Sequence, residues 1–257
     1  MDEMYLTRAF INPRRRGAAT FLGNPQKIHA AVMQAFPLAP AANAALGPRV
    51  LWRLDSEDHR RPVLWIVSPD KPDLHHVTDF YGWPESDRPF ETKDYRPLLN
   101  RLAAGQRYVF RVTINPVKSR HPGPEARETR AKVRGQVVPL VGAHNQISWF
   151  AQRAHKWGFE LLPGSVPMPE TDQPSDTPLP FAVEIRDRKR LRFRRSESDK
   201  KLVTLQTVTL EGMMRVTDPQ LLREALTRGV GRARGYGCGL ISLAPCSKPT
   251  GKPPVYC

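Results

Sequence analysis

The order in which strand and helix patterns follow one another constrains the fold of this chain more than any other feature. A strand pattern over 4–11 precedes a helix that begins at Asn24-Pro25, where Asn24 can cap the first turn and the proline takes the first helical position. Apolar residues then recur at helical spacing as far as Phe36. The elements expected next are strands at 50–54 and 63–67, a short helix at 73–80 and a weak strand at 90–95.

The second half of the chain repeats this order less regularly. A strand over 107–117 alternates polar and apolar residues, and a helix over 143–157 carries a clear apolar stripe. A basic loop over 118–135 and a proline-rich connection over 163–180 interrupt the pattern. The remaining elements expected are strands at 185–195 and 202–216, a helix from Asp218 to about Arg228, and a strand at 236–243.

Two successive βαββαβ units predict an α+β protein built from tandem ferredoxin-like (RRM-like) domains. We place the N-terminal domain at 1–96, the C-terminal domain at 97–245 and a tail at 246–257. Because this topology serves many functions, function has to be argued from particular residues.

The charge of the chain indicates its class of partner. The 257 residues include 40 Lys and Arg against 25 Asp and Glu, a formal net charge of +15. A hydrophobic fraction of 40% is ordinary for a globular protein, so the chain is not a disordered basic tail. The excess positive charge therefore indicates a polyanionic partner, and nucleic acid is the most common one.

Several classes of protein are excluded by composition. The long uncharged stretch 28–48 contains prolines and polar residues, so we expect no membrane-spanning helix. The three cysteines form no C-x-x-C pair and cannot all pair with one another, which favours reduced thiols in the cytoplasm. Without a recognisable metal-binding motif, we expect neither a metal nor another cofactor.

The segment 186–201 is the strongest candidate for nucleic-acid binding. It holds nine basic residues against three acidic ones, and arginines occupy every second position from 190 to 194. On a strand this spacing places the arginines on one face and Leu191 and Phe193 on the core side. The alternative is an edge strand that carries charge to prevent aggregation. The cations predicted to bind nucleic acid in this hairpin are Arg188, Arg190, Arg192, Arg194 and Arg195.

Two further basic segments are weaker candidates. The glycine-rich segment 228–239 contains Arg232 and Arg234, and its backbone amides could approach phosphates. It matches neither a dinucleotide fingerprint nor a P-loop, and the alternative is a sharp turn packed against a neighbouring strand. The loop that begins at Lys118 either contacts phosphates or is merely solvated, and the sequence leaves both open.

His29 is the candidate for proton transfer. Helical geometry places it at the edge of the apolar stripe of the first helix, between core and solvent. An imidazole with a pKa near 6.5 can exchange a proton at neutral pH. The alternative is a partly buried histidine whose ring is held by hydrogen bonds.

Particular motifs in this sequence resemble a known family. They are Met4-Tyr5-Leu6-Thr7-Arg8, the helix that begins Asn24-Pro25-Gln26-Lys27-Ile28-His29, the strand Val50 to Asp55, the segment Phe110 to Lys118, and the ending Gly229 to Pro245. Together they are similar to the CRISPR-repeat-processing endoribonuclease of type I-E systems, the Cse3/CasE family of Cascade subunits. The resemblance spans 4–245, and the last motif is the most specific.

The resemblance implies tandem ferredoxin-like domains that bind the stem-loop of the CRISPR repeat RNA and associate with other Cascade subunits. It also implies metal-independent cleavage at the 3′ base of the stem, where the 2′-hydroxyl attacks the adjacent phosphate and leaves a 2′,3′-cyclic phosphate. His29 falls on the family's catalytic histidine, as general base or general acid. The 186–201 hairpin falls where the family inserts basic residues into the RNA groove.

One position departs from the pattern of this family. Some members carry a tyrosine three residues before the histidine, where this chain has Gln26. Glutamine can donate a hydrogen bond to a phosphoryl oxygen, but it cannot transfer a proton at neutral pH. A non-catalytic subunit that holds CRISPR RNA is therefore the alternative function. A generic DNA-binding protein is disfavoured, because the sequence shows no helix-turn-helix, zinc finger or basic zipper.

Overall fold

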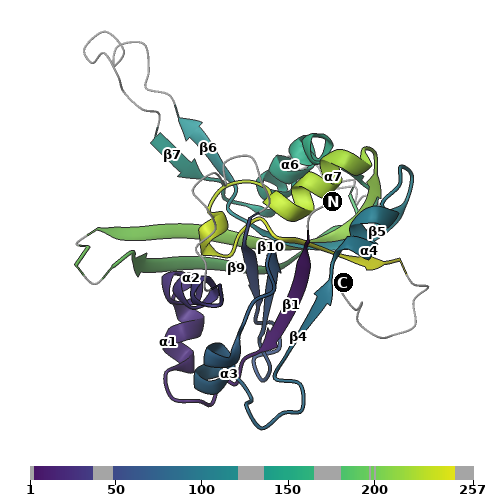
Figure 1. Cartoon of the computed structure of the whole chain (residues 1–257). Coiled ribbons are helices and arrows are strands. Elements are labelled where there is room, and N and C mark those ends of the chain that lie inside the picture. The colour runs from purple at the N-terminus through teal and green to yellow at the C-terminus, as the bar shows by residue number, and fades with distance from the viewer. Residues whose placement is uncertain are drawn as a thin grey trace.

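The computed structural model describes residues 3–36, 49–120, 136–164, 181–196, 198–199 and 201–246. Two sheets form its framework, and their strands run across one another in Figure 1. The parts of the predicted connections and tail at 121–135, 165–180 and 247–257 lie outside the described residues. No helix within the described ranges is both long and apolar enough to cross a membrane.

The N-terminal sheet has the strand order β2-β3-β1-β4 with every neighbouring pair antiparallel, which is the ferredoxin-like arrangement. Asn24 accepts hydrogen bonds from the backbone N–H groups of Gln26 and Lys27, so it caps α2 as predicted. The elements are β1 (Tyr5–Phe10), α1 (Ala18–Gly23), α2 (Pro25–Gln34), β2 (Leu51–Asp55), β3 (Val63–Ser68), α3 (His75–Tyr81) and β4 (Phe90–Asp94), followed by α4 (Arg96–Arg101).

The C-terminal sheet has the order β11-β5-β10-β8, with β9 also paired to β10. Two strands, β8 and β9, together take the position of the second strand of a ferredoxin-like unit. β8 pairs with one end of β10, and β9 pairs with the rest of it. Its elements are β5 (Arg107–Ile114), β6 (Val117–Arg120), β7 (Gln136–Pro139), α6 (Ala143–Ala154), η1 (His155–Trp157), β8 (Phe159–Leu161), β9 (Val183–Arg194), β10 (Leu202–Val216), α7 (Pro219–Arg228), η2 (Arg234–Tyr236) and β11 (Ile241–Pro245).

The predicted tandem of βαββαβ units is confirmed, with corrections at its edges. The predicted strand at 236–243 is wrong at its start, since β11 begins at Ile241 and a 3₁₀ turn, η2, precedes it. Gly237 and Gly239 have φ angles of +80° and +89°, which an extended strand cannot accommodate. The short helices α1 and α4, the hairpin β6–β7 and the strand β8 were not predicted.

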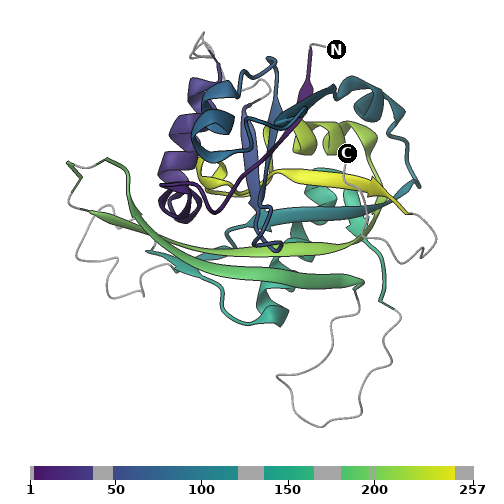
Figure 2. The same cartoon turned by 90° about the horizontal axis from the view of Figure 1, so that it is seen from below.

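The two sheets share a hydrophobic core. One face of the N-terminal sheet, covered by the helices α1 to α3, buries Phe21, Ile28 and Val32. The opposite face packs Leu51 and other residues against the C-terminal sheet, so the main core spans both units. Figure 1 shows α6 and α7 on the far side of the C-terminal sheet from α1 to α3, and Figure 2 shows the hairpin β9–β10, in green, running past the N-terminal helices. The architecture leaves the long hairpin β9–β10 projecting beyond this body.

Candidate nucleic-acid interface

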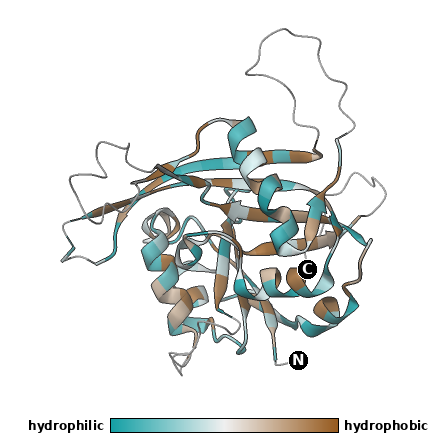
Figure 3. Ribbon diagram, turned by 90° about the horizontal axis from the view of Figure 1, so that it is seen from above, coloured by the Kyte–Doolittle hydropathy of each residue, from teal (hydrophilic) through white to brown (hydrophobic). Residues whose placement is uncertain are grey.

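The hairpin β9–β10 presents two chemically different sides. Arg188, Arg190, Arg192 and Arg194 are exposed on one side, as the sequence predicts. Arg188 donates from Nε to Oε1 of Gln146 at 3.1 Å, which shows that this side faces α6. The alternation of hydrophilic and hydrophobic residues along the hairpin is visible in Figure 3. Arg195, at the tip of the hairpin, is also exposed.

The other side of the hairpin faces α2 and η2. Phe193 is buried there with its ring centroid 4.8 Å from that of Tyr236, and Leu191 lines a small cavity that Pro25 and Ile28 of α2 also line. The prediction that Leu191 and Phe193 face inward is confirmed. Both side chains pack at the junction between the hairpin and the N-terminal unit.

A β-bulge changes which side of β9 each residue faces. The pairing of β9 with β10 shifts register between Thr209 and Leu210, opposite Arg186. The extra residue moves Arg186 to the side of the N-terminal unit, where it pairs with Glu57 at 3.3 Å, while Arg188 faces α6. The bulge therefore places Arg186, which pairs with the N-terminal unit, on the other side of the strand from Arg188, Arg190, Arg192 and Arg194.

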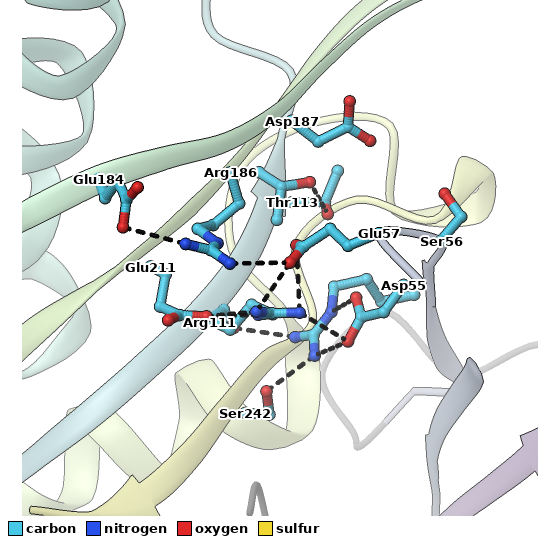
Figure 4. Close-up of polar contacts among 12 residues, drawn as sticks. Asp55, Ser56, Glu57, Arg111, Thr113, Glu184, Arg186, Asp187, Glu211 and Ser242 are labelled. Carbon is cyan, nitrogen blue, oxygen red and sulfur yellow. Dashed lines mark hydrogen bonds and ion pairs between the residues drawn. The ribbon is translucent and has the colours of Figure 1, made fainter. Parts of the chain in front are cut away.

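A polar network joins the two units beneath the hairpin (Figure 4). Glu57, just after β2, lies 3.2 Å from Nη1 of Arg111 on β5 as well as beside Arg186. Arg111 also pairs with Glu211 of β10. Nearby, Lys189 of β9 donates to the hydroxyl of Ser56. The base of the hairpin is thus fixed to the turn that follows β2.

Arg53 is the buried centre of this network. Its guanidinium is inaccessible to solvent and donates through Nε and Nη2 to the two carboxylate oxygens of Asp55, at 2.7 and 2.9 Å. Burial raises the pKa of Asp55, but the charges of Arg53 and Arg111 outweigh it and hold this pKa below its ordinary value. The other donors of Arg53 bind the backbone oxygens of Arg111 and Leu240 and the hydroxyl of Ser242.

His29 lies on α2 and faces η2. A β-carbon on Gly235 would lie 3.8 Å from Cε1 of His29, so the ring stands directly beside this turn. Nδ1 of His29 is buried and has no hydrogen-bond partner among the described residues. Burial lowers the pKa of His29 below its ordinary value of 6.5. The position at the edge between core and solvent is as the sequence predicts.

The glycine-rich segment is a tightly packed turn. A β-carbon on Gly237 would lie 2.6 Å from the ring of Trp52, and one on Gly239 would lie 2.3 Å from the carbonyl oxygen of Val230. Arg232 is exposed, whereas Arg234 is partly buried and donates from Nη1 to the carbonyl oxygens of Arg228 and Gly229. The glycines thus have a packing role that the sequence left open.

The structure brings only some of the predicted residues together. His29, Gly235 and the inner side of the hairpin meet at η2, while the exposed arginines of the hairpin lie on its opposite side and Lys118 lies on the hairpin β6–β7. No group of three or more His, Cys, Asp or Glu side chains suited to a metal occurs in the described part of the chain. The ion-pair network around Arg53 was missed, although the spacing Arg53-x-Asp55 on a strand could have indicated it.

A separate cleft of about 820 Å³ lies against the turn between β2 and β3, beside the end of β1. It is lined by Phe10, Arg15, Arg61 and Trp83 among others, and none of the predicted site residues lines it. The histidine site and this cleft are therefore distinct features.

Comparison with known proteins assigns the family. Residues 4–245 match the model of a family described as CRISPR associated protein. The chain is 30% identical to the CRISPR-associated endoribonuclease Cse3 of Thermus thermophilus over 243 residues, 94% of this chain and 100% of that protein. It is 26% identical to the CRISPR system Cascade subunit CasE of Escherichia coli over 200 residues, 71% of this chain and 88% of that one.

Solved structures agree with this result. The structure of Thermus thermophilus Cse3 bound to an RNA representing a pre-cleavage complex superposes with a TM-score of 0.70 at 28% identity, covering 95% of this chain and 100% of that one. The match therefore extends over nearly the whole length of both chains. This chain therefore belongs to the CRISPR-associated protein family, within its type I-E Cse3/CasE branch.

Proposed function

We propose that this chain is a CRISPR-repeat endoribonuclease that cleaves precursor RNA at the 3′ base of the repeat stem-loop and stays bound to the product within Cascade. The observation that carries this proposal is the position of His29, half-buried on α2 with its ring beside Gly235. The names of the relatives, an endoribonuclease and a Cascade subunit, support the class of reaction and the class of partner.

The chemistry of His29 suits a general base. In the neutral ring that acts as a base, the one proton lies on Nδ1, which is buried without a partner among the described residues, and Nε2 keeps its lone pair. Burial lowers the pKa of His29, and the neutral imidazole predominates at pH 7. Nε2 is then free to accept a proton from the 2′-hydroxyl of the nucleotide before the scissile phosphate.

The reaction then proceeds within the RNA itself. The 2′-oxygen bonds to phosphorus as Nε2 of His29 takes its proton, and the bond from phosphorus to the 5′-oxygen breaks. The products are a 2′,3′-cyclic phosphate and a 5′-hydroxyl, and the proton for the leaving oxygen comes from the imidazolium or from water. Because the nucleophile and its base are both organic groups, this mechanism requires no metal ion.

The hairpin β9–β10 would hold the stem. The deep, narrow major groove of A-form RNA admits few side chains for base recognition, but its phosphates accept hydrogen bonds from arginine. The exposed arginines on the α6 side of the hairpin would contact these phosphates. Because the other side of the hairpin packs on η2, the base of the bound stem would lie near His29.

A non-catalytic subunit that holds CRISPR RNA is the second candidate, and Gln26 is the residue that favours it. Gln26 lies one helical turn before His29 and cannot supply a proton at neutral pH. If cleavage depends on a second acid at this position, the chain binds the stem-loop without cutting it.

The test is cleavage of two repeat RNAs in excess EDTA. One is the natural RNA, and the other lacks the 2′-hydroxyl before the scissile phosphate. The proposal predicts a 2′,3′-cyclic phosphate from the natural RNA, and binding without cleavage for the deoxy RNA. Cleavage of the deoxy RNA would contradict the proposed mechanism, and binding of both RNAs without scission would identify a non-catalytic subunit.

A further inference from the structure

Three consecutive residues of η2 face three different parts of the molecule. Tyr236 packs on Phe193 of the hairpin, and Gly235 lies beside His29. Arg234 points the other way, toward the end of α7, where Nη1 lies 3.2 Å from the carbonyl oxygens of Arg228 and Gly229. The turn therefore connects the hairpin, the histidine and a third surface that no part of the proposed mechanism uses.

This third surface is a basic pocket of about 230 Å³. Four cations line it, and Glu224 is the one carboxylate in its lining among the described residues. Trp157 and Leu221 supply an apolar wall, and both are at least partly accessible to solvent. The cations of the basic pocket are Arg49, Lys156, Arg228 and Arg234.

Stabilisation of α7 explains only part of this pocket. Cations near the C-terminal end of a helix interact favourably with its dipole and its free carbonyl groups. This accounts for Arg234, which donates to two such carbonyls, and for Arg228, which lies 3.6 Å from Glu224. It does not account for Arg49 and Lys156, which come from other segments of the chain.

Arg49 and Lys156 add positive charge that the described residues do not neutralise. Neither has a carboxylate within 4.0 Å in the parts of the chain that the structure describes. The backbone N–H of Arg49 donates to the carbonyl oxygen of Thr227 at 3.1 Å, which holds this arginine against α7. Burial, and then the charges of Arg49 and Arg228, lower the pKa of Arg234, as expected where like charges converge.

Cations beside an accessible indole are suited to single-stranded nucleic acid. Phosphates pair with the cations, and an unpaired base can stack on the aromatic ring. An RNA strand that leaves the stem on the hairpin and passes His29 at the scissile phosphate would cross η2 and reach this pocket next. The occupant that fits this path is the segment on the 3′ side of the cleavage point.

We propose that the basic pocket formed by Arg49, Lys156, Trp157, Arg228 and Arg234 binds the unpaired nucleotides on the 3′ side of the scissile phosphate. This assignment rests on the proposed function and adds a substrate subsite to it. The pocket anchors the part of the precursor that the reaction releases. It therefore contributes to binding of the precursor and not to binding of the cleaved product.

The test is binding of two RNAs by the full chain, each with a 2′-deoxy nucleotide before the scissile phosphate to prevent cleavage. One RNA carries an unpaired 3′ flank, and the other ends at the cleavage point. Wild type is compared with the double variant Arg49→Gln/Lys156→Gln, which leaves Arg228 and Arg234 in place. A matched control, Lys71→Gln/Arg101→Gln, removes the same charge at two exposed positions that do not line the pocket.

We expect the pocket variant to bind the flanked RNA roughly tenfold more weakly while it binds the trimmed RNA like wild type. The slope of log affinity against log salt should fall by about 1.4 for the flanked RNA, at about 0.7 for each single-strand phosphate that the variant no longer neutralises. The control variant should keep the preference of wild type for the flanked RNA. Thermal unfolding of each variant establishes that it is folded.

Several results would overturn the assignment. An equal loss of affinity for both RNAs would mean that the pocket binds the stem. No loss of affinity for either RNA, or equal affinity of wild type for the two RNAs, would mean that the pocket does not bind RNA. Failure of the variant to assemble with the other Cascade subunits, with normal binding of both RNAs, would assign the pocket to a protein partner. The proposed function fails separately, if wild type neither binds nor cleaves the natural repeat RNA.

Discussion

Arg53 and Asp55, two residues apart on β2, form a bidentate ion pair in which the arginine is inaccessible to solvent. The guanidinium donates to five acceptor atoms, three of which lie in the C-terminal unit. This pair therefore connects the sheet that carries His29 on its helical layer to the sheet that carries the hairpin.

Replacing Arg53 with methionine should strongly destabilise the fold. The change leaves the carboxylate of Asp55 largely buried and without its main partner, which costs about 3–5 kcal/mol in comparable sites. Urea unfolding of Arg53→Met measures this loss. The double variant Arg53→Met/Asp55→Leu should recover much of the stability, and a loss below about 1 kcal/mol in the single variant would contradict this role.

The stability of the protein should fall in acid partly because of Asp55. Its pKa is held below the ordinary 3.8 in the folded state, so its contribution is fully present above about pH 5. The contribution is lost as the pH falls through 3.8 and then through the lower folded value. The free energy of unfolding from pH 7 to pH 3 should therefore decline more steeply for wild type than for Asp55→Asn, and parallel curves would contradict this account.

The pH dependence of cleavage should report the lowered pKa of His29. Because burial favours the neutral ring, kcat/KM should decline in acid along a limb whose midpoint lies below pH 6.5, the ordinary pKa of histidine. A rate profile between pH 4.5 and 8 measures this limb. His59→Ala removes an exposed histidine on the turn after β2 and should keep the same profile, whereas a midpoint above 6.5 in wild type would contradict a neutral general base.

The exposed arginines of the hairpin should contribute affinity that depends on salt. The triple variant Arg190→Gln/Arg192→Gln/Arg194→Gln should lower the salt dependence of stem-loop binding by roughly one unit of slope for each phosphate that it no longer neutralises. The triple variant Lys71→Gln/Lys93→Gln/Arg101→Gln removes the same charge elsewhere and should have a much smaller effect. Equal effects of the two variants would show that only the net charge matters.

The glycine-rich turn should tolerate substitution only where the structure leaves room. Gly237→Ala should cost roughly 2 kcal/mol or more, since its φ is +80° and the new β-carbon would lie 2.6 Å from Trp52. Gly23→Ala, where nothing lies within 4 Å, should change the free energy of unfolding by less than about 0.5 kcal/mol. Equal stability of the two variants would contradict the packing role of Gly237.

Local sequence signals predicted much of the fold because they act over a few residues. Asn24-Pro25 and Asp218-Pro219 mark helix starts through capping, and both caps are present in the structure. The alternation around Phe193 predicted the two sides of the hairpin. Short elements such as α1 and β8 have too few residues to show a period.

The parts that were missed depend on contacts between distant residues. The burial of Arg53 requires oxygens at positions 111, 240 and 242, which no local pattern connects to it. The bulge at Arg186 adds one residue without changing the composition of the strand, so its effect on side-chain direction cannot be predicted from the sequence pattern. The predicted strand wrongly includes the segment around Gly237. The positive φ of Gly237 follows from its packing against Trp52, a contact between distant residues that the local sequence does not show.

The central claim is that His29 performs proton transfer in a metal-free cleavage of repeat RNA. The most direct measurement is the single-turnover cleavage rate in excess EDTA for wild type and His29→Ala, with stem-loop affinity measured for both. We predict cleavage by wild type and a rate lower by roughly 10²–10⁴-fold in the variant, with affinity unchanged. Equal rates for the two proteins would contradict the claim.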